Sequence, residues 1–145
     1  MKELFGDLWD LTPRADALCI TTNGTITNSG RGVMGRGLAY QAKQRYPGLE
    51  YRLGKLLKEG GNHVHILRTV SPILISFPVK HLWEQKADPL LIVRSAQELV
   101  ALADEKGWTN IVLPRPGCGN GGLTWNEVRP LLEPFLFDRF TVVEL

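Results

Sequence analysis

Residues 17–37 read Ala-Leu-Cys-Ile-Thr-Thr-Asn-Gly-Thr-Ile-Thr-Asn-Ser-Gly-Arg-Gly-Val-Met-Gly-Arg-Gly, an apolar run that leads into a glycine-rich loop. The run Ala17–Thr22 has the length and composition of a buried strand. The loop, residues 23–35, is followed by a helix-like segment at residues 36–46, which Pro47 ends because proline cannot continue the hydrogen-bond ladder. Strand, loop and helix in this order are the building unit of an α/β sheet.

The same alternation of short apolar runs and longer periodic segments continues along the chain. Asp88 before Pro89 predicts a helix start, and Thr124 with Glu127 three residues later predicts a capping box. The strands predicted in this way are residues 4–5, 17–22, 63–67, 73–77, 111–113 and 140–143, and the helices are residues 36–46, 49–58, 89–106 and 124–137.

Strands that alternate with helices imply a central sheet with helices on both faces. The 145 residues contain no internal repeat and no linker, a length that suits one compact domain. We therefore predict a three-layer α/β/α fold with a mixed central sheet, formed as a single domain by residues 1–145.

The composition limits the kinds of partner and the cellular compartment that we expect for this protein. A net charge of +2 is too small for a wide grip on duplex DNA, but it leaves single-stranded DNA open as a partner. No run is long enough to cross a membrane, the first residues do not look like a signal peptide, and two cysteines are too few for a disulfide framework. We expect a cytoplasmic monomer without a cofactor. His63 and His65, on one face of a predicted strand, lack further metal ligands at a suitable spacing.

Two glycine-rich loops follow predicted strands, residues 23–35 and residues 114–123. Glycines let main-chain N–H groups approach an anion, and the helix after each loop adds the partial positive charge of its N-terminus. Ligands of α/β sheets bind where strands end and lead into helices. Two loops at one sheet edge fit a diphosphate better than a monophosphate. Neither loop has the Gly-Lys-Ser/Thr of a P-loop.

Three segments in order resemble the macrodomain family: Val-Met-Gly-Arg-Gly-Leu-Ala at residues 33–39, Phe-Pro-Val-Lys-His-Leu-Trp at 77–83, and Pro-Gly-Cys-Gly-Asn-Gly-Gly-Leu-Thr-Trp at 116–125. Within the family they are similar to the branch of the terminal ADP-ribose protein glycohydrolases and the DarG antitoxins, which remove ADP-ribose from thymidine in DNA. The resemblance implies a macrodomain fold, an ADP-ribose site and ADP-ribosyl hydrolysis.

The resemblance also assigns roles. Asp7 and Leu8 would bind adenine, Asn23 the distal ribose, and Lys80 would act near that ribose. Catalysis would rest on Lys80 and Asn23. The residues expected to bind the ligand are Asp7, Leu8, Asn28, Val33, Met34, Gly35, Arg36, Gly37, Pro78, Gly117, Cys118, Gly119, Asn120, Gly121, Gly122 and Leu123. Two positions depart from the family: Ile20 replaces an asparagine, and Gly121 stands where the protein glycohydrolases carry a catalytic aspartate.

Several residues keep two interpretations. Asp7 caps a turn or binds adenine. Lys80, charged, stabilises a ribose oxygen or, neutral, attacks the anomeric carbon. Trp83 packs in the core or covers the ligand. Cys118 lies before a helix N-terminus, which favours a thiolate, but no histidine partner is apparent. Arg31, Arg36 and Arg115 either form a rim for a nucleic-acid backbone or are ordinary solvated charges.

The leading hypothesis is an ADP-ribosyl glycohydrolase that removes ADP-ribose from nucleobases in DNA, in which water attacks an oxocarbenium-like anomeric centre. One alternative is a hydrolase of protein-ester-linked or free ADP-ribose derivatives, including the 1″-phosphate. The other is a reader that binds ADP-ribose without catalysis.

Overall fold

The computed structural model describes all 145 residues, Met1–Leu145. Six strands form one sheet in the order β1-β6-β5-β2-β4-β3, and all neighbours are parallel except the antiparallel pair β3 and β4. This confirms the predicted mixed sheet. The strands are β1 (Lys2–Phe5), β2 (Ala17–Asn23), β3 (His65–Arg68), β4 (Leu74–Lys80), β5 (Ile111–Pro114) and β6 (Phe140–Glu144).

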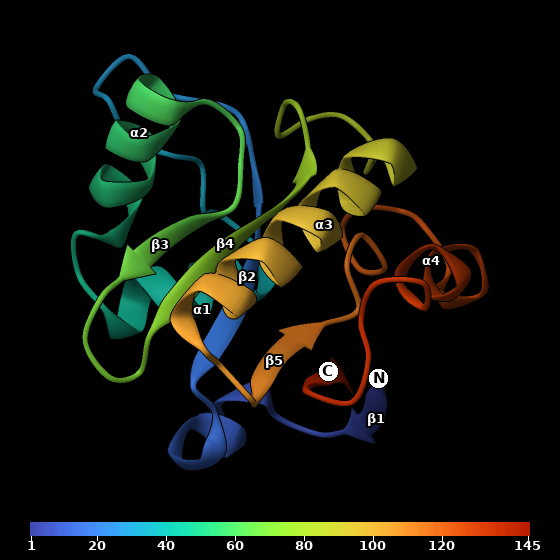
Figure 1. The fold of residues 1–145 in the computed structure, drawn as a ribbon. Coiled ribbons are helices and arrows are strands. Elements are labelled where there is room, and N and C mark those ends of the chain that lie inside the picture. The colour runs from blue at the N-terminus through green and yellow to red at the C-terminus, as the bar shows by residue number, and fades with distance from the viewer.

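Helices cover both faces of the sheet (Figure 1). One face packs against α1, α2 and a 3-10 helix, η1, and the other packs against α3 and α4. The helices are η1 (Leu8–Arg14), α1 (Gly37–Arg45), α2 (Leu49–Gly60), α3 (Pro89–Lys106) and α4 (Trp125–Leu132). The three-layer α/β/α prediction is therefore confirmed.

The central strand β2 contributes side chains to both cores, because successive residues of a strand point to opposite faces. Ala17 and Cys19 pack with α3 and α4, whereas Leu18 and Ile20 pack with α1 and α2. All four are at most 1% exposed. A strand buried on both faces reads as a continuous apolar run, which is how residues 17–20 read in the sequence.

The predicted starts of α3 and α4 and the predicted end of α3 are confirmed. The Asp88 carboxylate accepts a hydrogen bond from the Leu90 N–H, and Gly107 ends α3 in the left-handed region. Thr124 and Glu127 form the complete capping box. Helix α4 begins two residues after Leu123, the last residue that the sequence assigns to the ligand.

Several boundaries differ from the prediction, most of them by one or two residues. Helix α4 ends at Leu132 rather than at residue 137, because Pro134 has no N–H to continue the ladder. Strand β4 continues through Pro78, which is tolerated because β3 pairs only with Leu74–Ser76 and needs no N–H from Pro78. Strand β3 begins at His65, so His63 lies outside it.

The helix η1 was not predicted. Its N-cap is Asp7, whose carboxylate accepts a hydrogen bond from the Trp9 N–H over 3.0 Å. Pro13 lies inside this short helix. None of the helices in the chain combines the length and the apolar character needed to span a membrane.

Candidate functional site

A cavity of about 750 Å³ opens at the carboxyl ends of β2, β4 and β5. Both glycine-rich loops line it, as expected for ligand sites of α/β sheets. A third segment, residues 83–86 after β4, forms another wall of the cavity. The lining consists of residues 21–23, 33–39, 79–80, 83–86, 114–115, 117, 119–122 and 145.

Most of the residues that the sequence assigned to the ligand lie together in this lining. They are Asn23, Val33, Met34, Gly35, Arg36, Gly37, Lys80, Gly117, Gly119, Asn120, Gly121 and Gly122. The structure places the others outside the lining, namely Asp7, Leu8, Asn28, Pro78, Cys118 and Leu123.

Asp7 lies close to one end of the cavity although it does not line it. The Gly6 N–H donates to the main-chain oxygen of Glu144, and the next residue, Leu145, is part of the lining. One carboxylate oxygen of Asp7 is used to cap η1, so the capping interpretation of this residue holds. Leu8 is completely buried in the core beneath it.

The remaining residues outside the lining, except Asn28, have structural contacts. Asn28 is exposed at the tip of the first loop. The Pro78 oxygen accepts a hydrogen bond from the Ser95 hydroxyl over 2.7 Å. Leu123 packs in the core, and its N–H donates to the Gly117 oxygen. Burial raises the pKa of the Cys118 thiol to about 11, an effect larger than the opposing charge of Arg115. The expectation that Cys118 favours a thiolate is therefore wrong.

Asn23 holds the first loop in shape. Its side-chain amide donates to the Val33 oxygen over 3.1 Å, and its side-chain oxygen accepts from the Thr25 N–H over 3.0 Å. These bonds tie the two ends of the loop together at the point where β2 ends. Ile20, which stands where the family carries an asparagine, is completely buried and packs in the core.

The second loop is folded tightly around Gly117. Both Gly117 and Gly122 adopt positive φ angles, +74° and +78°, which glycine tolerates best. A Cβ added to Gly121 would lie 2.5 Å from the Gly117 oxygen. The Gly121 oxygen also accepts a hydrogen bond from the Ala87 N–H over 2.9 Å, which joins this loop to the segment after β4.

Lys80 is the last residue of β4 and is the register partner of Asn23 on β2. The two residues proposed for catalysis are thus direct neighbours across the sheet. The Lys80 amine donates to the main-chain oxygen of Trp83 over 3.3 Å, and the Lys80 main-chain oxygen accepts from the Asn62 side chain over 3.0 Å. Lys80 is half-buried, with its side chain in the cavity lining.

The segment after β4 brings in residues that sequence reasoning missed. Glu84, Gln85 and Lys86 line the cavity, and Glu84 is the only acidic side chain of the lining. Trp83, left open between core and ligand, is 47% exposed in the lining rather than packed in the core. The lining residues that were not assigned to the ligand also include Thr21, Thr22, Leu38, Ala39, Val79, Pro114 and Leu145, together with Arg115, which was considered only for a rim. Most of these residues lie in or beside the predicted loops or in the segments of the family resemblance, which was the available signal, whereas no signal pointed to Leu145.

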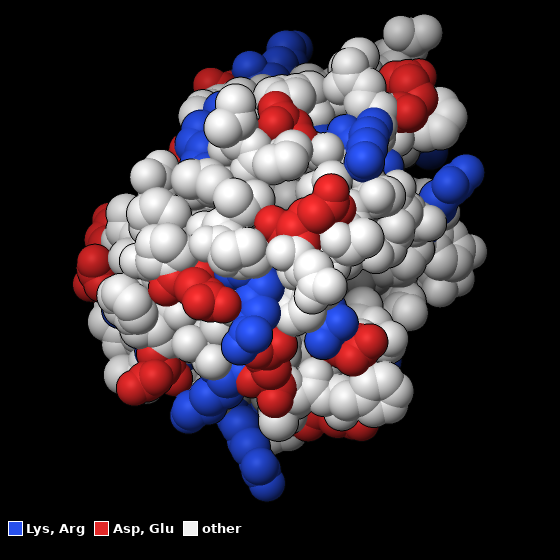
Figure 2. Space-filling model, turned by 90° about the vertical axis from the view of Figure 1, so that its right-hand side faces the viewer, with Lys and Arg blue, Asp and Glu red and all other residues white.

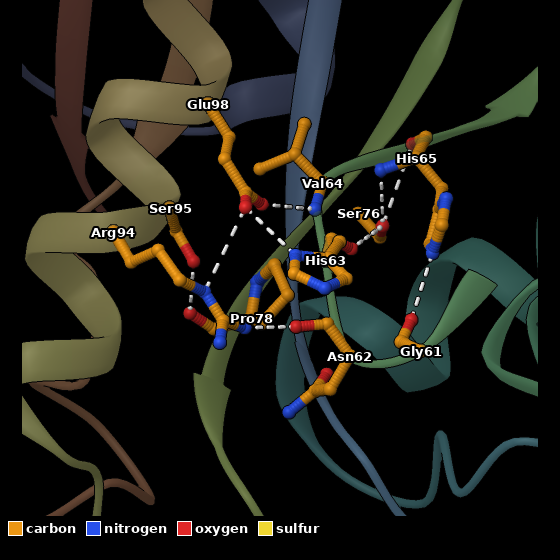
Figure 3. A network of polar contacts seen from close by, with 10 residues as sticks. All are labelled: Gly61, Asn62, His63, Val64, His65, Ser76, Pro78, Arg94, Ser95 and Glu98. Atoms are coloured by element: carbon orange, nitrogen blue, oxygen red, sulfur yellow. Dashed lines mark hydrogen bonds and ion pairs between the residues drawn. The ribbon is translucent and has the colours of Figure 1, made fainter.

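A network of polar contacts joins α3, β4 and residues 61–65 (Figure 3). Glu98 of α3 binds the His63 ring over 2.7 Å and the Val64 N–H over 2.9 Å. Arg94 donates to the Asn62 main-chain oxygen. The His65 ring instead contacts the Gly61 oxygen over 2.8 Å. The two histidines therefore have separate partners, and Asn62 is fixed between α3 and the Lys80 main chain.

The arginines proposed for a rim separate into two groups. Arg36 and Arg115 line the cavity, whereas Arg31 contacts Ser29 within the first loop. Arg115 also pairs with Glu144 at 3.3 Å and lies over the Trp125 ring at 4.9 Å. On the face that carries α4 and β1, positive and negative side chains are interspersed (Figure 2). That face offers no continuous basic band.

Comparison with known proteins agrees with this site. The Macro domain family model matches residues 27–132. A DNA ADP-ribosyl glycohydrolase of Mycobacterium tuberculosis is 31% identical over 108 residues, which cover 70% of this chain and 31% of that protein. The chain thus spans about a third of the length of this curated relative.

Solved structures of similar fold include the macrodomain of Mycobacterium tuberculosis DarG, with a TM-score of 0.79 and 25% identity over 99% of this chain and 97% of that chain. Thermosipho africanus DarTG in complex with ADP-ribose has a TM-score of 0.80 and 21% identity, over 99% of this chain and 42% of that chain. The family model covers more than half of the sequence, and the fold agrees along its whole length. The chain belongs to the macrodomain family.

Proposed function

We propose that this protein binds ADP-ribose in the cavity at the carboxyl ends of β2, β4 and β5 and hydrolyses the bond between ADP-ribose and a nucleobase in DNA. The observation that carries the proposal is the meeting of Asn23 and Lys80 beside two glycine-rich loops in one cavity. The similarity to a DNA ADP-ribosyl glycohydrolase supports the choice of linkage.

In this proposal the ligand lies along the sheet edge. Adenine occupies the end near Leu145, where the Gly6 N–H, next to Asp7, donates to the main-chain oxygen of Glu144. The diphosphate lies between the loops of residues 33–37 and 117–122. The N-termini of α1 and α4, which follow these loops, attract its negative charge. The distal ribose then reaches Asn23 and Lys80 at the other end.

Cleavage of the glycosidic bond builds positive charge on the anomeric carbon and negative charge on the leaving base. The Lys80 ammonium stabilises negative charge on a ribose or base oxygen, and Asn23 orients the ribose. Glu84, the only acidic side chain in the lining, is the candidate to orient or deprotonate the attacking water. Cys118 is not assigned as a nucleophile, because it lies outside the cavity lining and burial raises the pKa of its thiol.

The partner in this proposal is single-stranded DNA that carries ADP-ribose on a base, bound by a monomeric protein in the cytoplasm. Both cysteines are free, which suits a reducing compartment. The cationic side chains of the lining, Arg36, Lys80, Lys86 and Arg115, supply local attraction for phosphates without a wide basic surface.

The test is release of ADP-ribose from an oligonucleotide ADP-ribosylated on thymidine, with calorimetric binding of free ADP-ribose measured in parallel. We expect both release and binding. Binding without release from the oligonucleotide would reject the linkage and leave a reader or another hydrolase. Absence of both signals would reject the ADP-ribose site itself.

Hydrolysis of protein-ester-linked ADP-ribose is the second candidate. Gly121, in place of the catalytic aspartate of the protein glycohydrolases, favours it, because an ester needs less acid–base help than a glycosidic bond. The same assay on a glutamate-ester-linked substrate separates the two: faster release from the ester than from the oligonucleotide would favour this candidate.

A further inference from the structure

We propose that Trp83 is the residue that recognises the leaving group: its indole ring stacks on the nucleobase attached to the distal ribose. This inference rests on the proposed function, because it concerns what the ribose carries. It assigns a role to a residue that is neither part of a phosphate loop nor one of the proposed catalytic residues.

The first observation is the exposure of the ring in the cavity. Trp83 is 47% exposed and belongs to the cavity lining. Phe5 and Phe137 are more exposed, at 82% and 66%, but neither lines the cavity. A tryptophan that could be buried instead presents apolar surface at the ligand site, which points to a ligand with a flat apolar face.

The second observation is that the main chain of Trp83 is fixed on both sides. Its N–H donates to the Thr25 hydroxyl over 2.9 Å, and its oxygen accepts from the Lys80 amine over 3.3 Å. The segment turns sharply here, with the Gln85 N–H bonded to the Leu82 oxygen over 3.1 Å. The ring is thus held near Lys80 by bonds that do not involve the indole itself.

The third observation is the direction of the cavity. In the sheet order, β6 and β5 lie on one side of β2, and β4 lies on the other. Leu145 and Arg115 follow β6 and β5, whereas Lys80 and Trp83 lie at the end of β4. A ligand with adenine at the first end and its ribose at Lys80 directs the group on its anomeric carbon toward Trp83.

A nucleobase fits this position better than an amino-acid ester. Every base has a π-face that stacks on an aromatic side chain, and such stacking tolerates different base sequences. The ester group of an ADP-ribosylated aspartate or glutamate has no aromatic face. Trp83 therefore selects base-linked over ester-linked ADP-ribose, and it does so without a basic surface for the DNA backbone.

The first experiment compares Trp83→Ala, Trp83→Phe and Leu82→Ala. Leu82 is the neighbouring residue, is similarly exposed at 45%, and does not line the cavity. We expect Trp83→Ala to lower kcat/KM for the thymidine-linked oligonucleotide about tenfold, with most activity restored by Phe. The affinity of Trp83→Ala for free ADP-ribose stays within about twofold of the wild-type value, because free ADP-ribose carries no nucleobase on its distal ribose. Leu82→Ala should behave like the wild type in both assays. Equal losses on free ADP-ribose, or no loss on the oligonucleotide, would overturn the proposal.

A second experiment needs no turnover. In the Lys80→Ala background, tryptophan fluorescence is titrated with ADP-ribosylated oligonucleotide and with free ADP-ribose, with and without Trp83→Phe. We expect additional quenching by the oligonucleotide only when Trp83 is present. The same quenching in both proteins would reject the stacking. If the wild type releases no ADP-ribose from DNA, the proposed function fails, and this titration still decides the role of Trp83.

Discussion

A Cβ atom on Gly121 would lie 2.5 Å from the main-chain oxygen of Gly117, closer than Cβ atoms of folded proteins come to a non-bonded atom. The second loop can therefore close only with glycine at this position. The protein glycohydrolases that the sequence resembles carry a catalytic aspartate here. The tight loop leaves no room for that side chain, so the chemistry has to rely on other groups of the cavity.

We predict that Gly121→Ala lowers the free energy of unfolding by about 1–3 kcal/mol, because the loop has to open to admit the new methyl group. Gly119 is the matched control, since a Cβ there would meet nothing within 4 Å. Chemical denaturation of both variants tests this. Equal stabilities would mean that the loop adapts freely, and Gly121→Asp would then be expected to fold.

Asn62→Ala should slow turnover about tenfold with little effect on ADP-ribose binding, because it removes the bond that positions the Lys80 main chain. Asn110→Ala is the control: its side chain also donates to a main-chain oxygen, that of Arg14, away from the cavity. Both variants lose one hydrogen bond of the same kind. A similar decrease in turnover in both would show a general loss of stability rather than positioning.

Lys80→Ala should lower turnover about 100-fold or more and leave ADP-ribose binding largely intact. Lys80→Arg separates its two roles, because a guanidinium keeps the charge but cannot act as a neutral nucleophile. Partial activity in Lys80→Arg supports charge stabilisation, and an inactive Arg variant supports nucleophilic attack. Lys55→Ala, exposed on α2, is the control. Unchanged turnover in Lys80→Ala would remove this residue from the mechanism.

Removal of two buried hydroxyl groups should change the free energy of unfolding in opposite directions. The Thr22 hydroxyl is buried without a hydrogen-bond partner, whereas the Ser76 hydroxyl accepts from the His65 N–H over 2.9 Å. We expect Thr22→Val to raise the free energy of unfolding by about 1 kcal/mol and Ser76→Ala to lower it by about 1–2 kcal/mol. Thermal unfolding without ligand measures both. A destabilised Thr22→Val would indicate that its hydroxyl is satisfied in solution.

The stability should fall in acid as Asp88 is protonated. A hydrogen bond from His81, and further bonds from main-chain N–H groups at the start of α3, lower the pKa of this carboxyl. Its contribution is complete above the usual carboxyl range, about pH 4, and is lost as the pH falls through the lowered value.

Asp88→Ala should therefore be less stable than the wild type by about 1 kcal/mol at pH 7, the usual contribution of an N-cap. The difference should shrink toward pH 3. Asp138→Ala, which removes an exposed carboxyl without side-chain hydrogen bonds, should show no such change. A difference that stays constant between pH 7 and pH 3 would contradict the role of the ionised cap.

The sequence by itself determined the α/β architecture, the two glycine-rich loops and the starts of α3 and α4. These features are local: a strand buried on both faces reads as an apolar run, and a capping box needs only Thr124 and Glu127. Twelve of the residues assigned to the ligand are in the cavity for the same reason, since they lie at the ends of strands, in the loops that follow them or at the start of the next helix.

Only the tertiary structure decided what meets at the cavity. The pairing of β2 with β4 makes Asn23 and Lys80 neighbours although 57 positions separate them, from 23 to 80, and no local pattern encodes that register. The turn after β4 brings Trp83 and Glu84 into the lining, and its shape depends on bonds to Thr25 and to the second loop. Long-range pairing follows from the packing of the whole sheet, which is why no local pattern could place these side chains, and only the family resemblance put Asn23 and Lys80 near the same ribose.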